Sequence, residues 1–262
     1  MTNLVTRLAV VVAGLPIVLG AAWQGGWFLA ILALVAALVA LHELYRMARS
    51  LRPLVLAGYG GAVGALLGAQ LGDAQWMVGG FLAVFPLAFL FAAVSEVRQS
   101  TTVAIATTVL GAAWVGLGLA HLVLLRTLPE AGTDAVLALL LTVFATDTLA
   151  YLGGRLAGRH RMTPVMSPGK TWEGFVVGAL AGVATAFLVL YETEYGGATS
   201  IVFGITVVLA ATIGDLFESL VKRDLGTKDT GRILPGHGGV LDRIDSLLFA
   251  APAGLYVLLA LT

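Results

Sequence analysis

The sequence of 262 residues contains no cysteine and very little charge. Without cysteine, the chain has no disulfide, no thiolate metal site and no cysteine nucleophile. Only 11% of its residues are charged, whereas an average soluble domain has about 25%. Apolar residues take the place of the missing charge and make up 59% of the chain. This composition predicts an all-α, polytopic integral membrane protein.

Nine stretches of the chain are long and apolar enough to cross a bilayer as helices, which takes about 20 residues each. Their expected bounds are 8–23, 27–45, 53–71, 76–94, 102–125, 134–152, 174–191, 201–220 and 244–261. Several are rich in glycine and alanine, as "GGAVGALLGAQLG" shows, which lets helix backbones approach closely in lipid. Such faces could pack within one chain or form a homodimer interface.

The basic residues indicate how these spans are oriented. With nine spans, the N-terminus and the even-numbered loops share one side, and that side holds fourteen of the fifteen Lys and Arg residues. Arg126 is the exception. Because Lys and Arg are retained in the cytoplasm, we expect a cytoplasmic N-terminus and a C-terminus on the outside.

One short motif is similar to part of a phosphate-binding P-loop. Gly169-Lys170-Thr171 matches the end of that motif, but a strict P-loop has a glycine five residues earlier, where this chain has Pro164. The segment is therefore not a P-loop. Whether Lys170 meets a phosphate depends on the polar residues elsewhere in the chain.

A polar segment from Gly214 to Ser246 joins the eighth and ninth spans. If the eighth span stays helical to its end, Asp215, Glu218, Ser219 and Lys222 lie on one of its faces. Carboxylates in a membrane helix are costly, so they usually face a water-filled cavity and indicate a functional site. The alternative is that Asp215 only pairs with a basic residue to tie two helices together.

The loop after the eighth span carries basic residues, glycines and two more aspartates. Gly238 and Gly239 precede the ninth span, where backbone N–H groups and the helix N-terminus can bind an anion. Asp242 and Asp245 follow, three residues apart. Carboxylates from two helices, with no cysteine and few histidines, suit Mg²⁺, which bridges phosphate oxygens in phosphoryl and nucleotidyl transfer. Taken alone, these aspartates could simply cap the helix, and His237 could be structural.

A second polar segment covers residues 147–174, between the sixth and seventh spans. Asp147 and Tyr151 are four residues apart, which places them on one helical face. Asp147 could instead be only a buried partner of Arg155. We take six residues here as candidates for substrate binding: Asp147, Tyr151, Arg155, Ser167, Lys170 and Thr171.

The segment Ser219 to Asp245, "SLVKRDLGTKDTGRILPGHGGVLDRID", resembles the signature of phosphatidate cytidylyltransferases, also called CDP-diacylglycerol synthases. The matching pattern is Ser-x-x-Lys-Arg, four residues, Lys-Asp, then Pro-x-His-Gly-Gly and Asp-Arg-x-Asp. Upstream, "DTLAYLGGRLAGRH" and "SPGKTWEG" also resemble the family. The resemblance covers residues 147 to the C-terminus, whereas the first half matches only as a set of apolar spans.

The resemblance implies an enzyme of phospholipid biosynthesis in the bacterial inner membrane. It would transfer a cytidylyl group from CTP to phosphatidate, giving CDP-diacylglycerol and pyrophosphate. Phosphatidate would stay in the membrane lipid, and no nucleic acid is expected as a partner. The whole chain, 1–262, would be one transmembrane domain, with 1–140 mainly scaffold spans and 141–262 the catalytic helices and loops.

The resemblance also implies roles for single residues. Mg²⁺, with a second cation as a further expectation, would be held by Asp215, Asp242 and Asp245 beside Glu218. Four basic residues would bind the triphosphate or stabilise the departing pyrophosphate: Lys222, Arg223, Lys228 and Arg243. Further substrate contacts would come from Ser219, His237, Gly238 and Gly239, together with the six residues of the 147–174 segment.

Three other functions remain open at this point. A membrane-embedded lipid kinase would use the same groups but would release a nucleoside diphosphate. An ion-coupled transporter also buries carboxylates, but usually near the membrane midplane and between repeated halves. A purely structural scaffold would survive the loss of Asp242.

Overall fold

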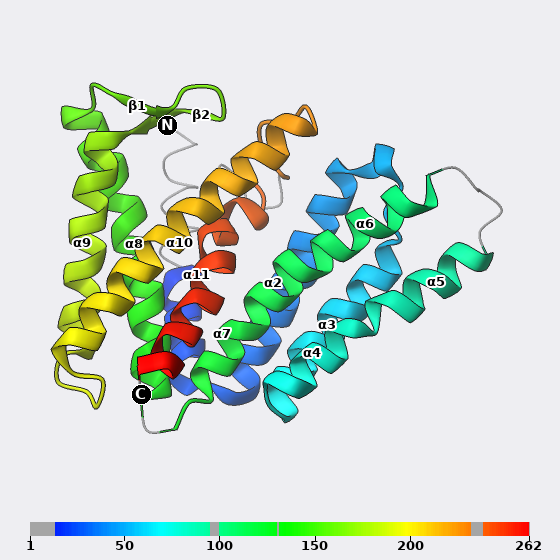
Figure 1. The fold of residues 1–262 in the computed structure, drawn as a ribbon, viewed down its shortest axis with the longest axis horizontal. Coiled ribbons are helices and arrows are strands. Elements are labelled where there is room, and N and C mark those ends of the chain that lie inside the picture. The colour runs from blue at the N-terminus through cyan, green and yellow to red at the C-terminus, as the bar shows by residue number, and fades with distance from the viewer. Residues whose placement is uncertain (1–13, 95–99, 130, 232–237, 262) are drawn as a thin grey trace. The chain divides into compact units, whose positions relative to one another are not determined.

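The computed structural model describes residues 14–94, 100–129, 131–231 and 238–261, which are mostly helical (Figure 1). The all-α expectation is confirmed. The chain divides into two compact units. Unit 1 comprises Met1–Leu124 and Leu225–Ile244, and unit 2 comprises Leu125–Asp224 and Asp245–Thr262. Residues 225–240, which we call the signature loop, thus belong to the same unit as most of the N-terminal half of the chain.

Unit 1 begins, among the described residues, with a helical segment over residues 14–24. It continues with α2 (Gly26–Met47), a 3-10 turn (Arg49–Leu51), α3 (Val55–Leu71), α4 (Ala74–Leu82), α5 (Val84–Val94), α6 (Thr101–Gly111), a π-helical segment (Ala112–Leu117) and most of α7 (Gly118–Arg126). Helix α3 lies at the centre and packs against α2, α4, α5 and the π-helical segment.

Glycines explain how closely α3 packs in this unit. The backbones of Gly64 in α3 and Gly80 in α4 approach so closely that a Cβ on either residue would collide with the carbonyl oxygen of the other. The glycine-rich face therefore packs within the chain, which is one of the two uses that the sequence left open.

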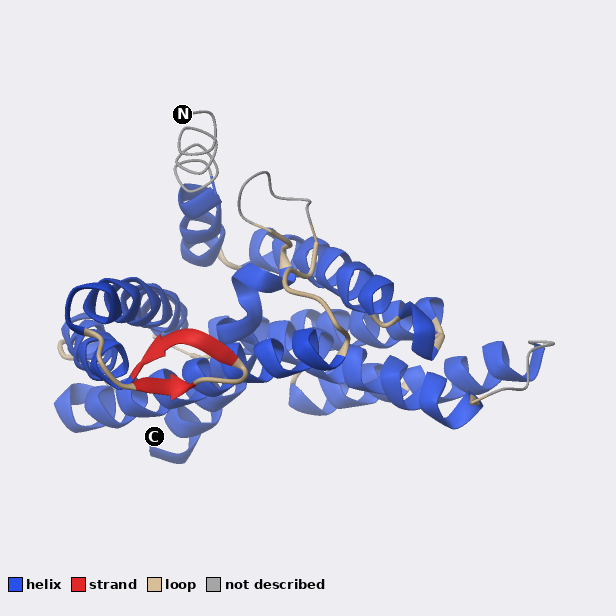
Figure 2. Ribbon diagram, turned by 90° about the horizontal axis from the view of Figure 1, so that it is seen from above, coloured by secondary structure: helices blue, strands red, loops and turns tan. Residues whose placement is uncertain are grey.

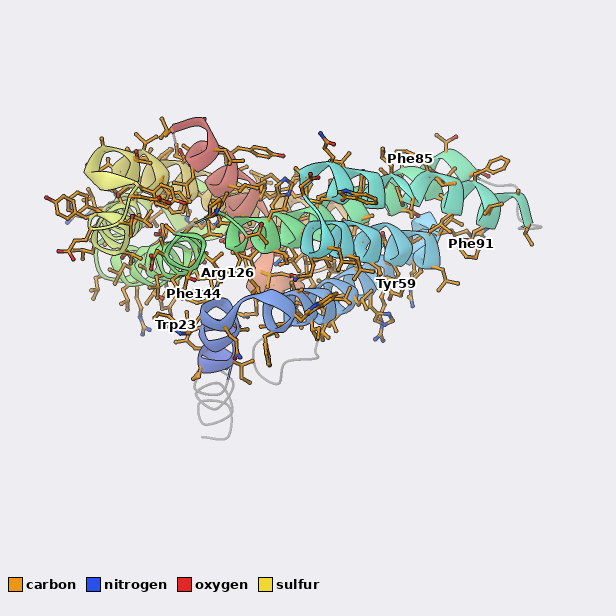
Figure 3. The ribbon with its side chains drawn as sticks, turned by 90° about the horizontal axis from the view of Figure 1, so that it is seen from below. Trp23, Tyr59, Phe85, Phe91, Arg126 and Phe144 are labelled. Atoms are coloured by element: carbon orange, nitrogen blue, oxygen red, sulfur yellow. The ribbon has the colours of Figure 1, made fainter. Side chains whose placement is uncertain are left out.

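Apolar side chains elsewhere in this unit stay uncovered, and Figure 3 shows Phe85 and Phe91 projecting from α5.

Unit 2 contains α8 (Gly132–Ala157), β1 (Arg161–Thr163), β2 (Ser167–Thr171), α9 (Trp172–Leu190), α10 (Gly196–Asp224) and α11 (Leu241–Leu261) from Asp245 onwards. Helices α8 and α9 run side by side, and α10 packs against both (Figure 1). A Cβ on Gly174 of α9 would lie 2.5 Å from the carbonyl oxygen of Ala150 in α8, and one on Gly178 would lie 2.6 Å from that of Thr146. Small residues again allow the close approach.

The two strands form an antiparallel hairpin between α8 and α9, visible in Figure 2. Arg161 pairs with Thr171 and Thr163 with Ser167, with an irregularity between these pairs. No strands were predicted in this segment from the sequence. The hairpin matters because β2 carries Lys170 and Thr171.

Seven helical stretches of the described chain are long and apolar enough to cross a membrane. They are Gly26–Met47, Ala74–Val94, Thr101–Arg126, Gly132–Ala157, Trp172–Leu190, Gly196–Asp224 and Leu241–Leu261. Val55–Leu71 is apolar but shorter, and the expected span over 8–23 lies largely outside the described residues. A polytopic membrane protein is confirmed, while the total of nine spans and their sidedness stay predictions.

Candidate active site

Unit 2 brings four carboxyl groups together. They come from Asp147 on α8, Asp215 and Glu218 on α10, and Asp245 on α11. The carboxyl group of Asp245 shares a hydrogen bond with Glu218 and interacts electrostatically with Asp215 and Asp147. Asp245 is 8% exposed and Glu218 only 1%. Because burying a charge is costly unless it is paired, this cluster needs positive partners or polar donors.

Two lysines provide positive partners. Helix α10 stays helical to Asp224, as the spacing predicts, so Lys222 follows Glu218 on one face, and its Nζ lies 2.7 Å from Glu218 Oε2. The second lysine is Lys170 of β2, whose Nζ lies 2.6 Å from Asp215 Oδ2. Asp215 therefore does pair with a basic residue. That residue lies on the hairpin, so the ion pair places the hairpin against α10.

The hairpin is anchored at both ends so that Lys170 reaches α10. Glu173, in the first turn of α9, accepts hydrogen bonds from the backbone N–H groups of residues 159 and 160, at 3.0 and 3.2 Å. From α10, Arg223 Nε donates to the carbonyl oxygen of Met166 at 3.3 Å. The loop geometry therefore depends on a carboxylate, Glu173, that the sequence did not identify as a site residue.

Other predicted residues of this segment lie near the hairpin. Thr171 is the N-cap of α9, because its Oγ1 accepts a hydrogen bond from Gly174 N at 3.2 Å. Arg155 Nη1 donates to Tyr151 Oη at 3.5 Å, and both side chains are exposed. Asp147 is exposed rather than buried, so it is not the buried partner of Arg155 that the sequence allowed.

Unit 1 contains a second polar cluster, in which the carboxylate of Asp242 binds the loop that precedes it. Asp242 Oδ2 accepts hydrogen bonds from Gly239 N at 2.8 Å, from Thr230 N at 3.1 Å and from Thr230 Oγ1 at 2.9 Å. Glu43 of α2 lies beside it, 2% exposed. Glu43 Oε2 accepts a hydrogen bond from Leu241 N at 2.9 Å and lies 3.5 Å from Thr230 Oγ1.

Glycines in this loop leave room for the carboxylates. A Cβ on Gly239 would lie 2.5 Å from Glu43 Oε2, and one on Gly231 would collide with Glu43 Oε1. Gly238 has φ +85, a conformation that favours glycine. The N–H of Gly239, which the sequence assigned to phosphate, here donates to Asp242.

The remaining predicted residues are placed as follows. Lys228, Arg223 and Arg243 are exposed, Ser167 is half-buried, and Ser219 is buried with its Oγ 3.5 Å from Asp215 Oδ1. His237 lies outside the described residues. The substrate-binding roles of these residues stay predictions.

The donor set of unit 2 fits Mg²⁺ by its chemistry, because it consists of carboxylate oxygens. Among the described residues, however, no three His, Asp or Glu side chains are placed to hold a metal ion. Asp215 and Glu218 instead hold the ammonium groups of Lys170 and Lys222. Mg²⁺ binding by Asp215, Glu218, Asp242 and Asp245 therefore stays a prediction.

Comparison with known proteins gives relatives along most of the chain. Residues 5–261 match the Cytidylyltransferase family. The phosphatidate cytidylyltransferases of Mycobacterium bovis and Mycobacterium tuberculosis are each 40% identical over 211 residues, which is 76% of this chain and 65% and 60% of those proteins. The phosphatidate cytidylyltransferase of Staphylococcus saprophyticus is 43% identical over 142 residues, or 53% of this chain and 54% of that protein.

The matches thus extend over less than two thirds of each of these relatives. The family match, in contrast, runs through both units and includes α2, the hairpin and the polar ends of α10 and α11. The carboxylates and lysines described above all lie within it. The chain therefore belongs to the cytidylyltransferase family.

Proposed function

We propose that this membrane protein is a nucleotidyltransferase that transfers a cytidylyl group from CTP to phosphatidate. The products are CDP-diacylglycerol and pyrophosphate, so the reaction serves phospholipid biosynthesis. The names of the relatives at 40–43% identity support the choice of substrates. The observation that carries the proposal is the cluster of unit 2, within the matched region. There Asp245 shares a hydrogen bond with Glu218 and interacts electrostatically with Asp215 and Asp147, and two lysines pair with Asp215 and Glu218.

Both substrates are polyanions, so the reaction needs positive charge between them, which the two lysines and a metal ion held by the carboxylates would supply. A phosphate oxygen of phosphatidate attacks the α-phosphorus of CTP, a new P–O bond forms, and the bond to the bridging oxygen of pyrophosphate breaks. The attacking oxygen is already anionic, so little general-base catalysis is required. The main barrier is repulsion between negative charges, which fixed positive groups lower.

We assign each side chain a role by its charge and chemistry. Asp215, Glu218 and Asp245 would hold Mg²⁺, which would supply positive charge against the phosphates. For Asp242, a role as metal ligand rests on the sequence alone. The exposed Arg223, Lys228 and Arg243 would attract the triphosphate. Lys170 and Lys222 would face phosphate groups, since their ammonium groups already lie at the carboxylate cluster.

The membrane, the orientation and the oligomeric state of the protein are part of the same proposal. The protein would lie in the bacterial inner membrane, with the N-terminus and the polar loops on the cytoplasmic side, where CTP is available. The acyl chains of phosphatidate would stay in the lipid between helices. A homodimer is compatible with the uncovered apolar side chains of α5, such as Phe89, which is 68% exposed.

The test uses purified protein in lipid–detergent micelles with phosphatidate, Mg²⁺ and each nucleoside triphosphate in turn. We expect pyrophosphate and a CDP-lipid with CTP, and a loss of at least about 100-fold in Asp245→Asn, because a group inside the carboxylate cluster is changed. Asp73→Asn is the control, since Asp73 caps α4 outside the cluster. Release of a nucleoside diphosphate would favour a kinase, and no product from folded protein would overturn the proposal.

A further inference from the structure

Glu43 is a buried acid in the first half of the chain, and neither the motifs nor the proposed reaction uses it. It lies near the end of α2, and its exposed fraction is 2%. A carboxylate inside an apolar helix is costly, so it is expected to have a specific task. Its carboxylate contacts Thr230, Gly231 and Gly239 in the loop before α11, and Leu241 at the start of that helix.

The contacts show what Glu43 holds. Its Oε2 accepts the N–H of Leu241, which is the first residue of α11, at 2.9 Å. A helix N-terminus has unsatisfied N–H groups, and a carboxylate there both accepts a hydrogen bond and interacts favourably with the helix dipole. Glu43 therefore helps to fix the residue at which α11 begins. Asp242 is the next residue of that helix.

The same carboxylate also shapes the loop before α11. Gly231 and Gly239 pack against it so closely that a Cβ on either residue would meet its oxygens. Thr230 lies between the two acids, with Oγ1 2.9 Å from Asp242 Oδ2 and 3.5 Å from Glu43 Oε2. One hydrogen-bonded network thus holds the loop against α2, and it consists of Glu43, Thr230 and Asp242.

We propose that Glu43 is a positioning residue of this enzyme, which acts by fixing the described loop residues 225–231 and 238–241 and thereby the orientation of Asp242. The inference rests on the proposed cytidylyl transfer for its effect on catalysis. The side chain itself touches no substrate in the proposed reaction. Groups that orient a functional carboxylate typically affect ligand affinity or activity by about 10- to 100-fold when they are removed.

The experiment compares Glu43→Ala, Glu43→Gln and Tyr45→Phe in the full-length protein. Glu43→Ala removes the acceptor, whereas Glu43→Gln keeps an oxygen in the same place. Tyr45→Phe is the matched control, because Tyr45 is also buried in α2 but donates its hydrogen bond to Thr108 O, away from the loop, at 2.7 Å. It separates a local effect on the loop from a general weakening of α2.

The first readout is hydrogen exchange of the amides at Thr230, Gly239 and Leu241. We expect faster exchange there in Glu43→Ala, recovery of most of the protection in Glu43→Gln and none of this effect in Tyr45→Phe. The second readout is kinetic: KM for CTP is expected to rise about tenfold in Glu43→Ala while KM for phosphatidate is unchanged. A merely structural role would reduce the amount of active protein and leave both KM values as they are.

The two readouts separate the two proposals. If the wild-type protein shows no CTP-dependent activity, the proposed function fails, and the exchange data still decide whether Glu43 holds the loop. Unchanged exchange at the three amides in Glu43→Ala would overturn the positioning role even in an active enzyme. Equal changes in Glu43→Ala and Tyr45→Phe would overturn it as well.

Discussion

Burial, rather than distance, should decide how much each lysine of the carboxylate cluster contributes to stability. The Lys222–Glu218 pair has an N–O distance of 2.7 Å, and its side chains are 14% and 2% exposed. The Lys170–Asp215 pair has a distance of 2.6 Å, with 23% and 31% exposed. The two pairs are thus nearly equal in geometry and differ in access to solvent. Substitution of each lysine by methionine, which keeps an unbranched apolar chain, isolates that difference.

The expected magnitudes follow from the charge that each substitution leaves behind. Lys222→Met leaves the carboxylate of Glu218 buried without this partner, which costs about 3–5 kcal/mol for a buried pair. Lys170→Met leaves Asp215 partly in contact with water, and the loss is expected to be about 1 kcal/mol. Removing both charges of the buried pair, in Glu218→Gln with Lys222→Met, should restore most of the stability.

The assay is reversible denaturation in mixed micelles, followed by helix circular dichroism and by the fluorescence of the five tryptophans. We expect Lys222→Met to be the least stable protein. Lys170→Met and the double variant should both lie close to wild type. Equal losses for the two single lysine variants would refute the argument from burial. A double variant as unstable as Lys222→Met would show that packing of the lysine chain, and not charge, was lost.

Two further predictions concern unit 1. Gly239→Ala should disturb the signature loop and reduce activity by about tenfold or more, because a Cβ there meets Thr230 Oγ1 and Glu43 Oε2. Gly79→Ala is the control in the same activity assay. It should leave activity unchanged, because the space around its Cβ is open. Asp73→Ala should destabilise the unit by about 1 kcal/mol in denaturation and leave activity unchanged, because it removes a helix cap that accepts two backbone N–H groups of α4.

The helices were predictable because long apolar stretches of suitable length form spans whatever their neighbours are. The stripe on α10 was predictable for a similar reason, since residues four apart on a helix are always adjacent, as Glu218 and Lys222 are here. Such local spacing holds without knowledge of the tertiary structure. The chemistry of unit 2 could therefore be located from the sequence, although its metal ligation stays a prediction.

The hairpin and its ion pair could not be predicted in the same way. Strands β1 and β2 have three and five residues, and Pro168 lies in the second of them. No alternation of apolar and polar residues of useful length exists there. What fixes the hairpin is tertiary contact: Glu173 binds its base, and Lys170 reaches Asp215 on another helix. These contacts depend on how α8, α9 and α10 pack, which local patterns do not contain.

Glu43 shows the limit most clearly, because its partners are far away along the chain. Thr230 and Leu241 are separated from it by 187 and 198 residues, so no motif links them. One signal was nevertheless present: Glu43 is an acid within a span of mean hydropathy 2.2, where a charge is costly. The polar residues of the second half were identified because many of them lie close together in the sequence. An isolated acid such as Glu43 gives no such signal. Weighing isolated acids by the hydropathy of their surroundings, rather than by the number of polar neighbours, would have placed Glu43 among the candidates.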